Sequence, residues 1–390
     1  MNVMFLHVGG IDPTAGGISR MTSVLSTGLK SKGINVYYLS MLKFDGVEYD
    51  KNQFFFPDSE VPTANENANY LIQFVKEKNI DILINQATTS SIYRDLSCIV
   101  KHRGVKIISV IHNSLLTPII NFSALKENKI IDLGLSFLLP LAKNRLFVSL
   151  LKKLYKFKYQ NHYKLLHENS DRVVLVSENN ISEFLFMVSL RNSDNIVAIN
   201  NAISLKEYKY NRNDKIKEVL WVGTPDFSIK RLDLALRIWK LIEKMNPDWV
   251  FTVLGDSPNL NRAKKLAKEL NLSKVNFIGR QDPIEYYKRA SFLIMTSTTE
   301  SFGLVLIEAM HFGVIPFSFD SFPASKDIIE SGKNGVLISS FDTESYANEL
   351  SRLMSDPDRT ELMAVNSKKK SKKYDINMII NQWILLFNNL

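Results

Sequence analysis

The chain has 390 residues, of which 45% are hydrophobic and 23% charged, a composition typical of a globular protein and not of a disordered or fibrous one. This length exceeds the roughly 250–300 residues at which one core stops growing, so it predicts two domains. Its single cysteine, Cys98, excludes an intrachain disulfide and favours a reducing compartment. A net charge of +9 leaves three partners open: nucleic acid, an anionic membrane and a phosphate-bearing substrate.

The N-terminal half alternates short apolar runs with helix-length segments. The first run, NVMFLHV, has no basic region before it, and this favours a strand over a signal peptide. The other runs cover residues 35–40, 81–86, 106–112 and 172–177. Their nearly continuous apolar character is typical of parallel strands covered on both faces. The alternation predicts an α/β, doubly wound, Rossmann-like domain over residues 1–205.

Residues 143–164 contain lysines and an arginine but no acidic residue. Apolar residues recur there at helical spacing, at Leu146, Leu150, Leu151, Leu154 and Phe157. The pattern predicts a basic amphipathic helix, which could lie on an anionic membrane or pack on the core with a solvated basic face.

The apolar stretch at residues 129–143 is interrupted by Asp132 and Pro140 and is shorter than the ~20 residues that span a bilayer. We therefore expect a cytoplasmic protein, peripheral on the inner face of the cytoplasmic membrane, with no nucleic-acid partner.

After a polar stretch at residues 200–217 the strand–helix alternation restarts. The predicted strands cover residues 218–223, 249–255, 274–279, 291–297, 313–319 and 335–339. They predict a second Rossmann-like domain over 206–372, and residues 373–390 predict a helix that packs back toward the N-terminal domain. Two such domains would face a cleft at the carboxyl ends of their strands, where open α/β sheets bind ligands.

Polar or glycine residues stand at several of these strand ends. Gly16 and Gly17 open the first predicted helix, where backbone amides could approach an anion. The spacing is neither G-x-G-x-x-G nor a P-loop. Asn85, Gln86 and His112 end two strands, where each could contact a ligand or satisfy a local polar group.

Lys230 and Arg231 follow the strand at 218–223 and stand at the start of a predicted helix. A lysine there opposes the helix dipole, and a bound anion would remove the conflict. Lys230 is therefore a candidate phosphate ligand. No group of His or Cys has metal-ligand spacing, and no G-x-S-x-G is present.

The segment TSTTESFGLVLIEAMHFG contains two carboxylates, Glu300 and Glu308. On one helix, residues eight apart would lie roughly 12 Å apart along the axis. A helix that begins near Gly303 would instead place Glu308 in its second turn and Glu300 before it. Both acids could then face one extended ligand.

ESFGLVLIEAM resembles the E-x7-E signature of the retaining glycosyltransferases with the GT-B fold, the family-four type or glycosyl transferases group 1. The resemblance covers nearly the whole chain, in order: GGISR, VIH, INNAIS, WVG…KR, VLGDSP, VNFIGR and SGKNGVLI. It implies transfer of a hexose or N-acetylhexosamine from a nucleotide-diphosphate sugar to a glycan acceptor, lipid-linked in view of the basic helix. The N-terminal domain would bind the acceptor and the C-terminal domain the donor.

The resemblance also implies roles for individual residues. The implied catalytic residues are Glu300, His112 and Lys230. The implied donor-binding residues are Gly17, Gly223, Lys230, Arg231, Gly279, Arg280, Ser301, Phe302, Gly303, Leu304 and Glu308. The implied acceptor-binding residues are Gly16, Arg20, Asn85 and Gln86. No metal and no cofactor are expected beyond the co-substrate, for which we expect a UDP-sugar before a GDP-sugar.

Two positions depart from the family pattern. Thr224 stands where an arginine usually follows the glycine, and Ala202 stands where a glycine is usual. Without that arginine the diphosphate lacks one cation. This leaves open the alternative that the protein is a catalytically weak GT-B-like accessory protein that binds a glycan. A sugar-nucleotide epimerase is the other alternative. The intact E-x7-E segment favours an enzyme, and the basic helix favours surface polysaccharide biosynthesis on a lipid-linked acceptor.

Overall fold

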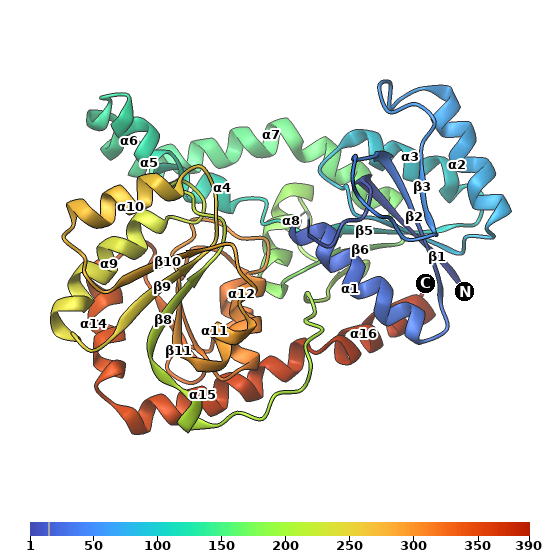
Figure 1. Ribbon diagram of the computed structural model, residues 1–390. Coiled ribbons are helices and arrows are strands. Elements are labelled where there is room, and N and C mark those ends of the chain that lie inside the picture. Colours follow the sequence, from blue (N-terminus) through green and yellow to red (C-terminus); the bar gives the residue numbers. More distant parts are fainter. Residues whose placement is uncertain (15) are drawn as a thin grey trace. The chain divides into compact units, whose positions relative to one another are not determined.

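The computed structural model describes residues 1–14 and 16–390, which form two compact units, each built on a parallel sheet with helices (Figure 1). The first unit contains Met1–Asn113, Tyr155–Ser204 and Tyr374–Leu390. The second contains Ser114–Leu154 and Leu205–Lys373. No helix in the described ranges combines the length and the apolar character needed to cross a bilayer.

Residues 114–154 belong to the second unit, whereas the sequence-based boundaries placed them in the first. The reason is a set of long-range contacts. The Asn121 side chain donates to the carbonyls of Thr298 and Ser321 at 2.6 and 2.7 Å, and Asn128 donates to the Phe227 carbonyl at 2.6 Å. Contacts between residues so distant in the chain leave no periodic signal in the sequence.

The first unit has a seven-stranded sheet in the order β3-β2-β1-β4-β5-β6-β7. Its strands are β1 (Asn2–Gly9), β2 (Asn35–Leu42), β3 (Gln53–Phe55), β4 (Ile82–Asn85), β5 (Lys106–Ile111), β6 (Arg172–Leu175) and β7 (Ile196–Ala198). The five predicted strands are present. The edge strands β3 and β7 were not predicted, because three residues are too few to show a period.

The helices of the first unit cover this sheet and include the C-terminal helix. They are α1 (Gly17–Ser31), α2 (Asn65–Glu77), α3 (Ser91–Lys101), η2 (Glu178–Asn180), α8 (Ile181–Val188) and α16 (Ile376–Asn388), while α7 (Arg145–Asn169) runs through the boundary between the units. Helix α16 packs on α1 at Gly28, where an added Cβ would lie 2.5 Å from Ile380 Cγ1. A glycine is therefore required for this close approach.

The second unit has a six-stranded sheet in the order β10-β9-β8-β11-β12-β13. Its strands are β8 (Ile216–Val222), β9 (Val250–Leu254), β10 (Val275–Gly279), β11 (Ala290–Met295), β12 (Ile315–Phe319) and β13 (Val336–Ile338). All six predicted strands are confirmed. The strand order reverses between β8 and β11, which places the topological switch point of this sheet between them.

Helices pack on both sides of this sheet around a core in which Trp239 is fully buried and stacks on Phe251. The helices are α4 (Thr117–Ile120), α5 (Phe122–Asp132), η1 (Ser136–Leu138), α6 (Leu139–Lys143), η3 (Arg212–Asp214), α9 (Leu232–Met245), α10 (Leu260–Glu269), α11 (Ile284–Arg289), α12 (Leu304–His311), α13 (Ala324–Ile328), α14 (Thr343–Met354) and α15 (Pro357–Ser371), with η4 (Lys372–Tyr374) at the unit boundary.

Candidate active site

The carboxyl ends of β8, β9 and β10 are packed backbone against backbone through three glycines. The amide of Gly223 donates to Leu254 O at 3.0 Å, and the amide of Gly255 donates to Gly279 O at 2.8 Å. A Cβ on Gly255, whose φ is +145°, would lie 1.7 Å from Gly223 O. Only glycine fits there, and it fixes where the loop after β8 begins.

Lys230, after β8, and Glu300, after β11, form an ion pair at the switch point of this sheet. Lys230 Nζ lies 2.6 Å from Glu300 Oε1, and Ser297 Oγ donates to the same oxygen at 2.6 Å. The Glu300 side chain is 11% exposed and that of Lys230 is 30% exposed. Both contacts use Oε1, so the carboxylate is held in one orientation while the pair stays accessible.

Asp226 shapes the loop that carries Lys230. Its Oδ1 accepts hydrogen bonds from the amides of Ser228 at 2.8 Å, Lys230 at 3.3 Å, and Ile229. Burial alone would raise the pKa of Asp226, but these amides outweigh it and lower that pKa, so the carboxylate stays ionised. The sequence analysis did not select Asp226, although Asp-x-Ser is typical of an Asx-turn.

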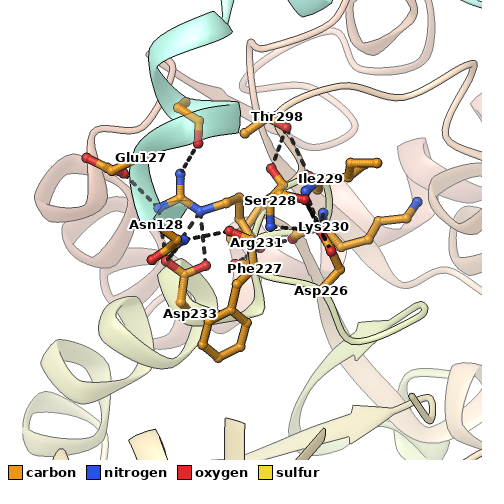
Figure 2. A network of polar contacts seen from close by, with 12 residues as sticks. Glu127, Asn128, Asp226, Phe227, Ser228, Ile229, Lys230, Arg231, Asp233 and Thr298 are labelled. Atoms are coloured by element: carbon orange, nitrogen blue, oxygen red, sulfur yellow. Dashed lines mark hydrogen bonds and ion pairs between the residues drawn. The ribbon is translucent and has the colours of Figure 1, made fainter. Parts of the chain in front are cut away.

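The loops after β8 and β11 are hydrogen-bonded to each other (Figure 2). The amide of Thr298 donates to Ile229 O at 2.7 Å, and Thr298 Oγ1 donates to Ser228 O at 2.9 Å. Thr296 Oγ1 donates to Lys230 O at 3.0 Å. These threonines, which sequence reasoning missed, fix the backbone on both sides of the ion pair.

Arg231 points away from Lys230, on the opposite side of the loop (Figure 2). Its guanidinium contacts Asp233 Oδ1 at 3.0 Å through Nε, Glu127 Oε2 at 2.9 Å through Nη2, and Ala124 O at 3.0 Å through Nη1. The side chain is only 2% exposed. The prediction that Arg231 binds the donor is therefore wrong, because its donors are committed to buried acceptors within the unit.

Burial acts to lower the pKa of Arg231, but the hydrogen bonds and charges of Asp233 and Glu127 raise it overall. The guanidinium thus stays a cation whose charge is neutralised inside the unit. Position 224, where the resemblance implies an arginine, is an exposed threonine. Arg231 does not replace that arginine, because its guanidinium is buried against Asp233 and Glu127.

The start of α12 supplies backbone amides beside the ion pair. Gly303 caps the helix with φ +96°, a left-handed conformation that favours glycine. Phe302 is 1% exposed, which anchors the turn, while Ser301 and Leu304 are partly exposed. The amides of a first helical turn are suited to an anionic group.

Glu308 lies in the second turn of α12, as the sequence analysis expected, and is 4% exposed. Tyr287 of α11 donates from its hydroxyl to Glu308 Oε2 at 3.4 Å. Gly279 has φ +82° and ends β10, and Arg280 beside it is exposed. Tyr287 was not selected from the sequence, since nothing local links α11 to α12.

In the first unit, His112 and Gln86 form a buried pair. His112 Nε2 donates to Gln86 Oε1, and the two side chains are 7% and 5% exposed. Burial, and then the nearby His7, lower the pKa of His112 to about 3, so the imidazole is neutral at neutral pH. Both residues line a narrow cavity that also contains Asn200 and Trp383.

Asn85 has a structural role instead of the predicted role in acceptor binding. It is fully buried, its Oδ1 accepts from the amide of Ala87 at 2.8 Å, and its Nδ2 donates to Ser97 Oγ at 3.2 Å. The prediction is wrong because both ends of the side-chain amide are occupied by these contacts and no part of the side chain reaches solvent.

The predicted anion-binding turn at the start of α1 is open. Gly16, with φ +128°, and Gly17 have no atoms within 4 Å of an added Cβ, and Arg20 is exposed.

No group of three or more His, Cys, Asp or Glu side chains gathers as a metal site within residues 1–14 and 16–390.

Comparisons with known proteins found one family match, which lies in the C-terminal part of the chain, and several similar proteins. Residues 205–370 match the family glycosyl transferases group 1. An uncharacterized glycosyltransferase of Haemophilus influenzae is 33% identical over 193 residues, 49% of this chain and 54% of that protein. A Campylobacter jejuni protein named GalNAc-alpha-(1->4)-GalNAc-alpha-(1->3)-diNAcBac-PP-undecaprenol alpha-1,4-N-acetyl-D-galactosaminyltransferase is 26% identical over 174 residues, which is 44% of this chain and 48% of that protein.

The match to solved structures extends over the whole chain. The Anabaena protein HepE, in complex with UDP and glucose, superimposes with a TM-score of 0.74 at 15% identity, covering 100% of both chains. The chain spans about half the length, or less, of the curated relatives that it matches first. Residues 205–370 belong to the group 1 glycosyltransferases, and the chain has the GT-B fold of two Rossmann-like units.

Proposed function

We propose that the protein is a retaining glycosyltransferase that moves a hexose or N-acetylhexosamine from a UDP-sugar to a glycan acceptor without a metal. The observation that carries this proposal is the Lys230–Glu300 ion pair at the β8/β11 switch point. It lies within the segment that belongs to the group 1 family. The HepE complex with UDP and glucose supports the choice of a UDP-sugar.

The geometry supports a division of labour along the donor. Lys230 and the amides at the start of α12 would stabilise the negative charge that grows on the departing diphosphate. Glu300 would stabilise positive charge on the sugar as the bond from its anomeric carbon to the phosphate oxygen breaks. The acceptor oxygen attacks from the same face, and its proton passes to the leaving phosphate. Glu308 would bind the ribose hydroxyls.

The acceptor that we propose is a lipid-linked glycan of surface polysaccharide biosynthesis, met at the inner face of the cytoplasmic membrane. The name of the Campylobacter jejuni relative, which specifies an undecaprenol-linked glycan, supports this. So does the basic segment at residues 143–164.

One observation favours a second candidate, a GT-B-like accessory protein that binds a glycan with little turnover. Thr224 is exposed at the position where the family resemblance implies an arginine, and the guanidinium of Arg231 is committed to Asp233 and Glu127. The diphosphate would then meet only Lys230 as a nearby cation from this loop.

A panel of radiolabelled nucleotide sugars tests both candidates through binding, slow hydrolysis and transfer. We expect one UDP-sugar to bind and to be hydrolysed. Glu300→Gln should lower turnover on the order of 10²-fold or more, with UDP affinity nearly unchanged, because its carboxylate acts on the sugar.

The matched control is Glu285→Gln, which changes an exposed carboxylate paired with Lys288. Binding without turnover would favour the accessory protein. Failure of every nucleotide sugar to bind would exclude the transferase.

A further inference from the structure

A surface of the second unit exposes many large apolar side chains between α5 and the first half of α7. These residues are Ile131, Leu133, Leu135, Phe137, Leu138, Leu141, Leu146, Leu150 and Leu154, and we call them the apolar surface. Phe137 is 73% exposed and Leu146 is 81% exposed. A contiguous chain segment with this exposure is unusual for a protein surface that faces only water.

Helix α7 shows that this exposure is a property of one helix face. Leu146, Leu150 and Leu154 are spaced four residues apart, so they lie on one side of the helix. They are 81%, 53% and 55% exposed. The alternative in which these leucines pack on the core is therefore wrong, because the buried residues of α7 are Tyr163 and Leu166, near its other end.

The apolar surface is bordered by positive charge. The cations of its segment are Lys143, Arg145, Lys152 and Lys153, and no acidic residue stands between Asp132 and Glu168. Arg145 and Lys153 are exposed on the same stretch of α7 as the leucines. This pairing of apolar residues with flanking cations matches the chemistry of an anionic lipid surface.

The surface is also connected through side-chain contacts to the loop of the candidate active site. Asn144 caps α7, since its Oδ1 accepts from the amide of Leu146 at 2.8 Å. At the other end of the segment, Glu127 of α5 binds Arg231 at 2.9 Å, and Arg231 directly follows Lys230. Helices α5 and α6 are in contact with each other (Figure 1).

We infer that the apolar surface is a membrane-docking site, which enters the interface of an anionic bilayer while Lys143, Arg145, Lys152 and Lys153 bind lipid phosphates. Charge complementarity selects lipid over a protein partner, because the exposed apolar residues are flanked by cations and by no acidic residue between Asp132 and Glu168. This inference deepens the proposed function, on which it rests for the lipid-linked acceptor. Its test measures lipid binding and not transfer, so the two can fail separately.

Vesicle flotation of the full chain tests the charge and the apolar contributions. We expect binding to vesicles of phosphatidylglycerol and phosphatidylcholine, and on the order of tenfold weaker binding to phosphatidylcholine alone. Leu146→Asp with Leu150→Asp, and separately Arg145→Glu with Lys153→Glu, should each reduce binding at least about tenfold. Leu362→Asp on α15, where Leu362 is 64% exposed, is the matched apolar control, and Lys265→Glu, with an 80% exposed side chain, is the charge control.

Tryptophan fluorescence tests whether the surface enters the bilayer. The native residues Trp221, Trp239, Trp249 and Trp383 are all buried. In Phe137→Trp, brominated lipids should therefore quench a new signal, whereas in Leu362→Trp they should not.

Equal binding of all variants, or equal quenching at positions 137 and 362, would overturn the inference. If Leu146→Asp with Leu150→Asp instead turned an oligomer into a monomer and vesicles did not bind, the surface would be a protein interface. UDP binding measured on the same variants should stay unchanged. If the unmodified chain does not bind UDP, this result would count against the proposed function and not against membrane docking.

Discussion

The two Rossmann-like units use the polar residues at their strand ends in opposite ways. In the second unit, Lys230 and Glu300 meet as a partly exposed ion pair at the switch point. In the first unit, Asn85 is fully buried and His112 is paired with Gln86 in the interior.

The difference shows that a polar side chain after a parallel strand can serve either a ligand or the fold. The second unit separates the two tasks within one loop, since Lys230 stays accessible and Arg231 is buried against Asp233. Variants that affect activity without stability, or stability without donor binding, can therefore test this contrast.

The largest effect is expected for Lys230→Met. Removal of the cation of the Lys230–Glu300 ion pair should lower turnover on the order of 10³-fold, which corresponds to about 4 kcal/mol. Thermal stability should change little, because the Lys230 side chain is 30% exposed and Ser297 still donates to Glu300 Oε1 after the substitution. Steady-state rates and the melting temperature of the same preparation check this.

Lys217→Met is the control for that variant, since Lys217 pairs with Asp248 at an exposed position. Nearly unchanged turnover in Lys230→Met would contradict the prediction and would mean that the ion pair has a structural role.

Arg231→Met should act mainly on stability. It would leave Asp233, 6% exposed, as a buried carboxylate without its cation, a change that costs about 3 kcal/mol. Chemical denaturation of the full chain measures this loss of stability. The UDP affinity of the folded variant should stay within about twofold of that of the unmodified chain. A loss of UDP affinity with unchanged stability would instead indicate that Arg231 binds the donor.

His112 should make the stability of the first unit depend on pH. Its pKa is about 3 in the folded chain and 6.5 in the unfolded chain, so the unfolded state binds the extra proton between these values. The contribution of neutral His112 to the free energy of unfolding is fully present above pH 6.5. It falls by about 1.4 kcal/mol for each pH unit below that value. Between pH 6.5 and pH 5 we expect a loss of about 2 kcal/mol.

Denaturation midpoints at several pH values, in the unmodified chain and in His112→Asn, isolate this residue. The variant should show a flatter pH dependence, whereas His102→Asn, at an exposed position, should not. Identical slopes would mean that His112 is accessible to protons and free to act at a site.

The smallest effect is expected for Glu308→Gln. The carboxamide keeps the volume and a hydrogen-bond acceptor for Tyr287, so the fold should persist. Loss of the charged acceptor for the ribose hydroxyls should weaken UDP binding roughly tenfold, or about 1.4 kcal/mol. Calorimetric titration with UDP checks this, and Glu344→Gln at an exposed position is the control.

Much of the fold and part of the site follow from local pattern. The apolar runs predicted every strand of the second sheet, and the E-x7-E spacing predicted that Glu308 lies in the second turn of a helix. The edge strands β3 and β7 and the partners Asp226 and Tyr287 did not emerge, because their significance depends on residues that are distant in the sequence.

The sequence by itself determined the alternation of strands and helices, the positive charge of residues 143–164 and the order of the family motifs. Only the tertiary structure decided that Lys230 faces Glu300 while Arg231 turns inward, that Asn85 is enclosed, and that Leu146 is exposed. The physical reason is that periodicity records which side chains share a face of a helix or strand. Long-range packing decides whether that face meets solvent, the core or a carboxylate, and local spacing in the sequence carries no information about this packing.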